Sequence, residues 1–161
     1  MLVSNASTLI LLAKVSALRM FLKDVKGVAI PKIVHDELLG KDSVDALVIK
    51  KEIEERNINV KHVKKESYSF ITSQFRLHEG EAAAYALFKQ EEGKAVLTDD
   101  SELIKLCKVE SIPFITSMAC IVRLFKKKKL SKEEALEKLD ALYHHGWYTQ
   151  KIYEYFKSEV N

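Results

Sequence analysis

The stretch AVLTDDSELIKLC, residues 95–107, joins a short apolar run, two adjacent carboxylates and a helical pattern in immediate succession. Residues 95–98 predict a buried strand and residues 100–109 a helix, so Asp99 and Asp100 fall at the carboxyl end of the strand. In open α/β sheets, ligands bind beyond this end of the strands. The stretch therefore predicts an α/β fold and the edge of the sheet at which a functional site would lie.

Polar or acidic residues also follow other short apolar runs or lie on the helices next to them. The first run of the chain ends at Asn5, the helix after the second run carries Glu37, and an alanine-rich helix begins at Gly80-Glu81. A site for a hard cation needs oxygen ligands of this kind, delivered from several strand ends and first helical turns. One such residue is weak support for a site, but four of them in this order favour one.

Short strand patterns alternate with helical patterns along the whole chain. Strands are expected at residues 1–4, 27–30, 58–60, 95–98 and 112–115, and helices at residues 7–14, 17–22, 31–39, 42–55, 66–75, 80–92, 100–109, 117–127, 131–143 and 149–158. Pro31 is expected at the first position of its helix and Gly93 at the C-cap of the alanine-rich helix. The alternation predicts a three-layer α/β/α fold with a central, mostly parallel sheet.

Composition bounds the class of protein. The chain has 161 residues, 47% hydrophobic and 30% charged, which fits a single domain over residues 1–161 with the closing helices, about 131–158, packed on it. The net charge of +3 permits a nucleic-acid substrate without requiring one. No apolar stretch reaches the roughly 20 residues of a membrane span. Cys107 and Cys120 lie in apolar helical patterns, so we expect buried thiols and a cytoplasmic location, with no cysteine-based metal site.

The ordered set of motifs resembles the PIN-domain family, the nuclease fold of VapC-type ribonuclease toxins, and in particular its short archaeal and bacterial PIN-like branch. The segments that carry the resemblance are residues 3–14, 30–37, 77–82 and 97–100, with further likeness at residues 139–140, 146–147 and Tyr153. Together they span nearly the whole chain. No single segment is specific, whereas the ordered set is.

The resemblance implies a nuclease that uses Mg²⁺ or Mn²⁺ and cleaves RNA. The family pattern maps its metal-binding acids onto Asn5, Glu37, Glu81 and Asp100, with Asp99 as a neighbour, and its catalytic acids onto Glu37, Glu81 and Asp100. Ser7 and Ser117 match polar positions that would orient the substrate. The resemblance also implies a homodimer held by a small antitoxin protein, as the toxin half of a toxin–antitoxin pair.

The sequence departs from the family pattern at Asn5, where an aspartate is expected. An amide oxygen still binds a hard cation, but it brings no charge and cannot act as a base. The remaining carboxylates repel one another, so a cation remains favoured at a weaker site. Two alternatives stay open: a catalytically weak PIN-like module that binds RNA or a protein, and a metal-dependent phosphatase or small-ligand α/β protein.

Each of these residues also has an ordinary structural explanation. Glu81 suits the first turn of a helix through the helix dipole, and Asp99 and Asp100 are common N-cap residues. Lysines at helix ends complement the dipole equally well, although Lys14, Lys126 and Lys127 are also candidates for phosphate contacts. The aromatic residues near the C-terminus, from Trp147 to Phe156, are expected to dock the last helix.

Overall fold

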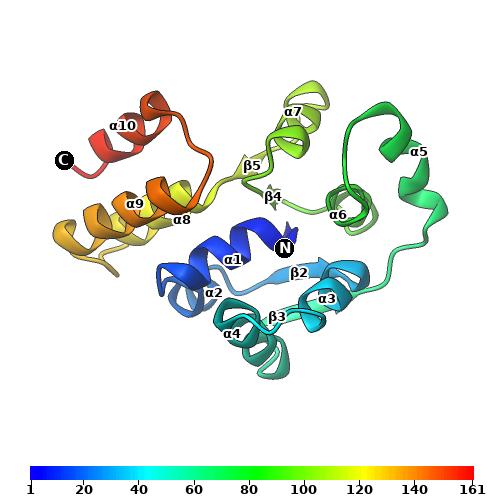
Figure 1. Cartoon of the computed structure of the whole chain (residues 1–161), viewed down its shortest axis with the longest axis horizontal. Helices are drawn as coiled ribbons and strands as arrows, with labels where there is room; N and C mark the ends of the chain where they lie inside the picture. Colours follow the sequence, from blue (N-terminus) through cyan, green and yellow to red (C-terminus); the bar gives the residue numbers. More distant parts are fainter.

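The computed structural model describes all 161 residues and contains one five-stranded sheet (Figure 1). The strands are β1 (Leu2–Ser4), β2 (Val28–Pro31), β3 (Ile58–Lys61), β4 (Ala95–Leu97) and β5 (Phe114–Ile115). They run parallel to one another in the order β3-β2-β1-β4-β5. The order reverses direction between β1 and β4, which is where open α/β sheets bind ligands.

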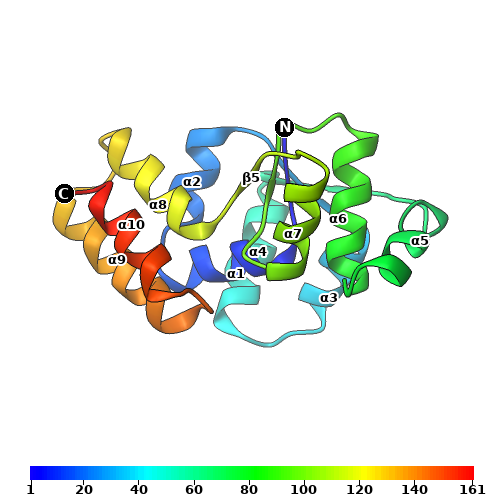
Figure 2. The same cartoon turned by 90° about the horizontal axis from the view of Figure 1, so that it is seen from above.

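Ten helices connect and cover the strands (Figures 1 and 2). They are α1 (Ala6–Lys14), α2 (Leu18–Val25), α3 (Lys32–Leu39), α4 (Val44–Glu54), α5 (Glu66–Gln74), α6 (Glu79–Gln90), α7 (Ser101–Val109), α8 (Ser117–Lys126), α9 (Lys132–His145) and α10 (Gln150–Ser158). Every predicted element is present, mostly within two residues of its expected bounds, and the three-layer α/β/α fold is confirmed.

Two local predictions were wrong. Pro31 does not open α3; it is the last residue of β2 and the N-cap, with φ of −65° and ψ of 150°, because the strand pairing with Lys61 continues to this residue. Gly93 is not the C-cap of α6, whose cap is Glu91; the left-handed turn is made by Glu92, with φ of 49°. Gly93 is needed for space, since a Cβ there would lie 2.8 Å from the ring of Phe88.

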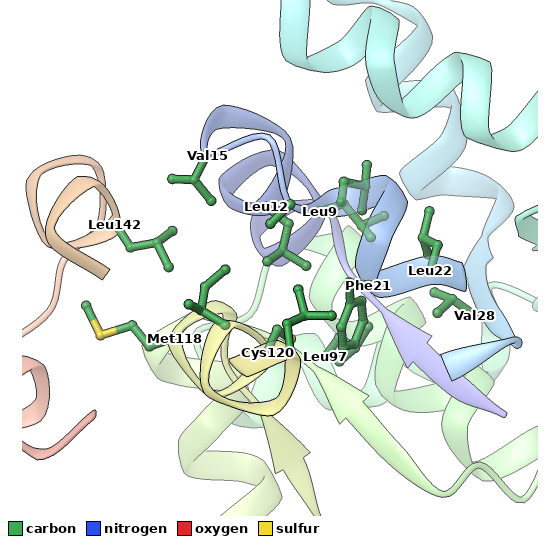
Figure 3. Close-up of a cluster of buried hydrophobic side chains, with 14 of the residues drawn as sticks. Leu9, Leu12, Val15, Phe21, Leu22, Val28, Leu97, Met118, Cys120 and Leu142 are labelled. Carbon is green, nitrogen blue, oxygen red and sulfur yellow. The ribbon is translucent and has the colours of Figure 1, made fainter. Parts of the chain in front are cut away.

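Hydrophobic residues form one cluster on each face of the sheet, because side chains along a strand alternate between its faces. The larger cluster packs α1, α2, α8 and α9 against Val28 and Leu97, as Figure 3 shows for its central side chains. The smaller one packs α6 and α7 against Val3, Ala29 and Val96. The two clusters hold the strands from both sides and so fix the edge at which β1 and β4 end.

The C-terminal helices pack beside α8 (Figure 2). The rings of Tyr143 and Tyr153 stack with centroids 4.5 Å apart, and Phe156 contacts the larger cluster. The expected docking role therefore holds for several aromatic residues but is wrong for Trp147, which is fully exposed. No helix has the length and apolar character needed to cross a membrane.

Both cysteines are free and buried, as expected. Burial raises the pKa of the Cys107 thiol to about 11, and burial also raises the pKa of Cys120. Reactive thiols have lowered pKa values and solvent access. Neither residue has the properties of a nucleophile.

Candidate active site

The loops that follow β1 and β4 are joined by hydrogen bonds at the carboxyl edge of the sheet. The Nδ2 of Asn5 donates to Oγ1 of Thr98 at 3.2 Å, and that hydroxyl also accepts from the backbone N–H of Asp100 at 3.0 Å. The hydroxyl of Ser7 donates to Oδ1 of Asn5 at 2.9 Å and accepts from the backbone N–H of Asp99 at 3.3 Å. This closed set fixes the loops before any ligand binds.

Asn5 is fully buried, and both ends of its amide are used in this set. A carboxylate at the same position could accept from Ser7 but could not donate to Thr98. The amide is therefore suited to joining two loops. The hydroxyl of Ser7, the predicted substrate-orienting residue, likewise forms its hydrogen bonds within the protein, to Asn5 and Asp99.

The carboxylate of Asp99 is the centre of a second hydrogen-bond network. It accepts from the hydroxyl of Thr8 at 2.6 Å, and from the backbone N–H and hydroxyl of Ser117, each at 3.0 Å. The hydroxyl of Tyr148 donates to it as well. Four donors from three separate elements thus satisfy this carboxylate, and Ser117 is held in the same network.

Tyr148 connects the C-terminal part of the chain to this network and also contacts the hydroxyl of Ser117. Burial, and then the charge of Asp99, raises the pKa of Tyr148 above its usual range, so the phenol stays protonated and can donate. A Cβ on Gly146 would overlap the ring of Tyr148, which explains the glycine at that position. The segment between α9 and α10 is therefore held against the start of α8.

Asp100 has a different environment from Asp99. Its Oδ1 caps α7 by accepting from the backbone N–H of Leu103 at 2.8 Å, as N-cap chemistry predicts, while Oδ2 has no hydrogen-bond partner in the protein. The negative charge of Asp100 also acts on Glu81, whose pKa it raises. Of the two adjacent aspartates, Asp100 is the one with a free oxygen.

Glu37 and Glu81 approach each other at the start of α6. A Cβ on Gly80 would lie 3.1 Å and 3.2 Å from the two carboxylate oxygens of Glu37, so the glycine leaves room for that carboxylate. Burial, and then the charge of Glu81, raises the pKa of Glu37; burial, and then the charge of Asp100, raises the pKa of Glu81. Oε2 of Glu81 is buried with no hydrogen-bond partner. These three acids form the acidic cluster.

The acidic cluster offers carboxylate oxygens, one of them a buried acceptor without a partner, and Lys41 and His78 offset only part of its negative charge. This is the chemistry that fits a hard cation. In the arrangement present, no three His, Cys, Asp or Glu side chains stand close enough together to hold one ion. Glu37 as a whole is exposed although the start of α6 partly covers its carboxylate, so its side chain has rotamers with which to approach the others. A cation would have to draw the glutamates together.

The lysines proposed for phosphate contacts lie elsewhere. Lys14 ends α1, about 14 Å along the helix from Asn5, and Lys126 ends α8, about 14 Å along that helix from Ser117. Lys14 pairs with Asp45 at 2.7 Å and Lys126 with Glu159 at 2.6 Å, while Lys127 is exposed. These residues complement the helix ends and are not brought to the acidic cluster.

Sequence reasoning missed the parts that Thr98 and Tyr148 play in the site. Thr98 could have been found, because a hydroxyl directly before two carboxylates at a strand end is placed to cap the loop. Tyr148 lies 49 positions from Asp99, and nothing in the local pattern predicts that contact.

Comparison with known proteins gave one match. A family described as a PIN domain matches residues 1–161, the full length of the chain. No curated protein and no solved structure matches it. The family match agrees with the strand order, the acids at the carboxyl edge and the full span of the resemblance. The chain belongs to the PIN-domain family.

Proposed function

We propose that this protein is a divalent-metal-dependent ribonuclease in which Glu37, Glu81 and Asp100 hold a Mg²⁺ or Mn²⁺ ion. Membership in the PIN-domain family indicates a nuclease-type function and a nucleic-acid substrate. RNA as the substrate, the metal ion and the individual residues are the proposal. The observation that carries it is the unpartnered, buried Oε2 of Glu81 between two further acids.

The acidic cluster is costly without a cation. A buried acceptor that lacks a hydrogen bond costs about 1–3 kcal/mol, and more when it is charged. Groups that destabilise the folded protein in this way concentrate at functional sites. A bound divalent ion would offset the repulsion and satisfy the free oxygens.

The protein's own groups have distinct roles in this proposal. A bound divalent ion supplies charge stabilisation at the phosphate and lowers the pKa of water. Glu37, Glu81 and Asp100 would hold that ion, and Oε2 of Glu81, which has no hydrogen-bond partner within the protein, would be one of the oxygens that bind it. The networks around Asn5 and Asp99 keep the two loops rigid, which holds Asp100 in place.

Cleavage of a fluorescent single-stranded RNA tests the proposal, with Mn²⁺, Mg²⁺ or EDTA. Asp100→Ser keeps a residue that can cap α7 but removes the carboxylate, and it should slow cleavage by at least about 100-fold. Ser131→Ala removes the cap of α9, far from the acids, and should leave cleavage unchanged. Cleavage that survives EDTA, or that Asp100→Ser leaves intact, would contradict the proposal.

A second candidate function rests on Asn5. Its amide carries no charge, so the site has three acids and no fourth charge. This favours a weak nuclease, or a PIN-like domain that binds RNA or a protein partner. Asn5→Asp in the same assay separates the candidates: faster cleavage supports the nuclease, whereas RNA affinity without cleavage in either form supports the binding module.

We also propose that this protein is the toxin of a toxin–antitoxin pair, that it forms a homodimer and that a small antitoxin protein binds it. They rest on the resemblance to VapC-type toxins. A short reading frame adjacent to the gene would support the pairing.

A further inference from the structure

A cavity next to the acidic cluster has features that the proposed nuclease chemistry does not use. Its volume is about 280 Å³, and it lies between α7 and the segment that joins α9 to α10. The lining includes Asp99, Ser101, Ile104, Lys108, Trp147 and Ile152. Trp147 is fully exposed to solvent although it borders the cavity, so its indole ring packs against no part of the protein.

We propose that this cavity binds one unstacked base of a single-stranded RNA, with Trp147 as the stacking surface. This inference rests on the proposed ribonuclease function and specifies the form of its substrate. Base–aromatic stacking and a positively charged path for the backbone are the two features by which proteins bind single strands. This cavity is lined by one exposed tryptophan and by two lysines, Lys105 and Lys108.

The aromatic feature is positioned by the adjacent residue. Tyr148 is anchored to Asp99 and Ser117, so the backbone next to Trp147 is fixed near the start of α8. The apolar side chains of Ile104 and Ile152 supply walls that fit the face and edge of a base. The anchor keeps Trp147 at the border of the cavity, while its exposed ring is free to turn toward a base.

The charge of the cavity suits an RNA strand. Lys105 and Lys108 line it; Lys105 also pairs with Glu102 at 2.6 Å, and Lys108 is exposed. The carboxylate oxygens of Asp99 accept hydrogen bonds from four donors of the protein, so they do not face a phosphate as free acceptors. Two residues of the lining, Asp99 and Ser101, flank Asp100 in the chain, so the cavity lies beside one member of the acidic cluster.

Trp147 is the sole tryptophan of the chain, so its fluorescence reports on this cavity directly. An eight-nucleotide single-stranded RNA with a terminal dye is titrated in EDTA, which prevents cleavage, and dye anisotropy and tryptophan emission are recorded together. We expect saturable quenching that follows the anisotropy curve. Trp147→Ala should weaken binding roughly 5- to 150-fold, and Trp147→Phe should weaken it less.

Two controls make the test specific. Phe70→Ala removes another exposed aromatic residue, on α5, and should leave the affinity unchanged. Lys108→Ala should reduce the dependence of the affinity on salt concentration. A blunt-ended duplex of the same sequence should bind more weakly, since its bases stay stacked.

Several outcomes would overturn the inference. They are an anisotropy change without quenching, an affinity that Trp147→Ala leaves intact, equal affinity for the duplex, or no RNA binding at all. A change in emission that depends on protein concentration without RNA would assign the cavity to a second copy of the chain. Because the titration contains no metal, its result is independent of the cleavage assay. Quenching without any cleavage would support the base-binding cavity and contradict the proposed nuclease activity.

Discussion

Glu81→Gln is expected to make the protein more stable in EDTA and, with Mn²⁺ present, at least about 100-fold slower in RNA cleavage. The substitution keeps the shape of the side chain but removes a charge that faces Glu37 and Asp100. Relief of this repulsion should add about 1 kcal/mol to the free energy of unfolding, because the site is partly exposed and screened. Urea denaturation in EDTA and the fluorescent cleavage assay measure the two effects.

The stability gained in Glu81→Gln should depend on pH, and it should be smaller in acid. Folding raises the pKa of Glu81 above its ordinary value of 4.5, so the folded state holds this proton more tightly than the unfolded chain does. The proton favours folding below pH 4.5, and this contribution is lost as the pH rises through the raised value. The stability difference between Glu81→Gln and the original protein should therefore close as the pH falls below 4.5.

Glu79→Gln is the matched control, because Glu79 lies in the same first turn of α6 but is exposed and pairs with Lys65 at 3.6 Å. Its charge acts on Glu37 less than that of Glu81 does, so Glu79→Gln should change stability and cleavage far less than Glu81→Gln. Equal effects of the two substitutions, or a loss of stability in Glu81→Gln, would show that the acidic cluster is not strained.

Asp99→Ala is expected to lower the free energy of unfolding by about 3 kcal/mol. The carboxylate accepts from Thr8, Ser117 and Tyr148, and its removal leaves these donors without their partner. Hydrogen bonds to a charged group contribute roughly 1.5–3 kcal/mol each, and partial access of water to Asp99 keeps the total below their sum. Urea unfolding with an unchanged m-value gives the difference directly.

Asp140→Ala is the control for Asp99→Ala. Asp140 also accepts from a tyrosine hydroxyl, that of Tyr153, but it lies at an exposed site. Its loss should cost less than about 1 kcal/mol. If Asp99→Ala costs no more than this, the network around Asp99 does not hold the C-terminal segment to the sheet.

The fold was largely predictable from the sequence because its signals are local. Short apolar runs such as residues 95–98 predicted the strands, and apolar residues at helical spacing predicted the helices. Both signals exist because each kind of element buries one face, and its apolar residues recur at a characteristic spacing. The boundaries at Pro31 and Gly93 were less predictable. There, strand pairing and the packing of Phe88 against the main chain decided the outcome.

The candidate site was predictable only in part. The acids Glu37, Glu81 and Asp100 were predicted from the ordered motifs, and they influence one another's charge in the fold. The uses of Asn5 and Asp99 were not predictable, because they depend on partners up to 93 positions away. A side chain that looks like a ligand in the sequence can have its oxygens fully used by hydrogen bonds that only the tertiary fold creates.

Mn²⁺ titration by isothermal calorimetry tests most directly whether Glu37, Glu81 and Asp100 share one cation. The original protein should bind one Mn²⁺ per chain, and Glu37→Gln, Glu81→Gln and Asp100→Asn should each weaken that binding at least about tenfold, while Glu79→Gln should not. An affinity that is the same in all five proteins, or the absence of any saturable binding, would contradict the account.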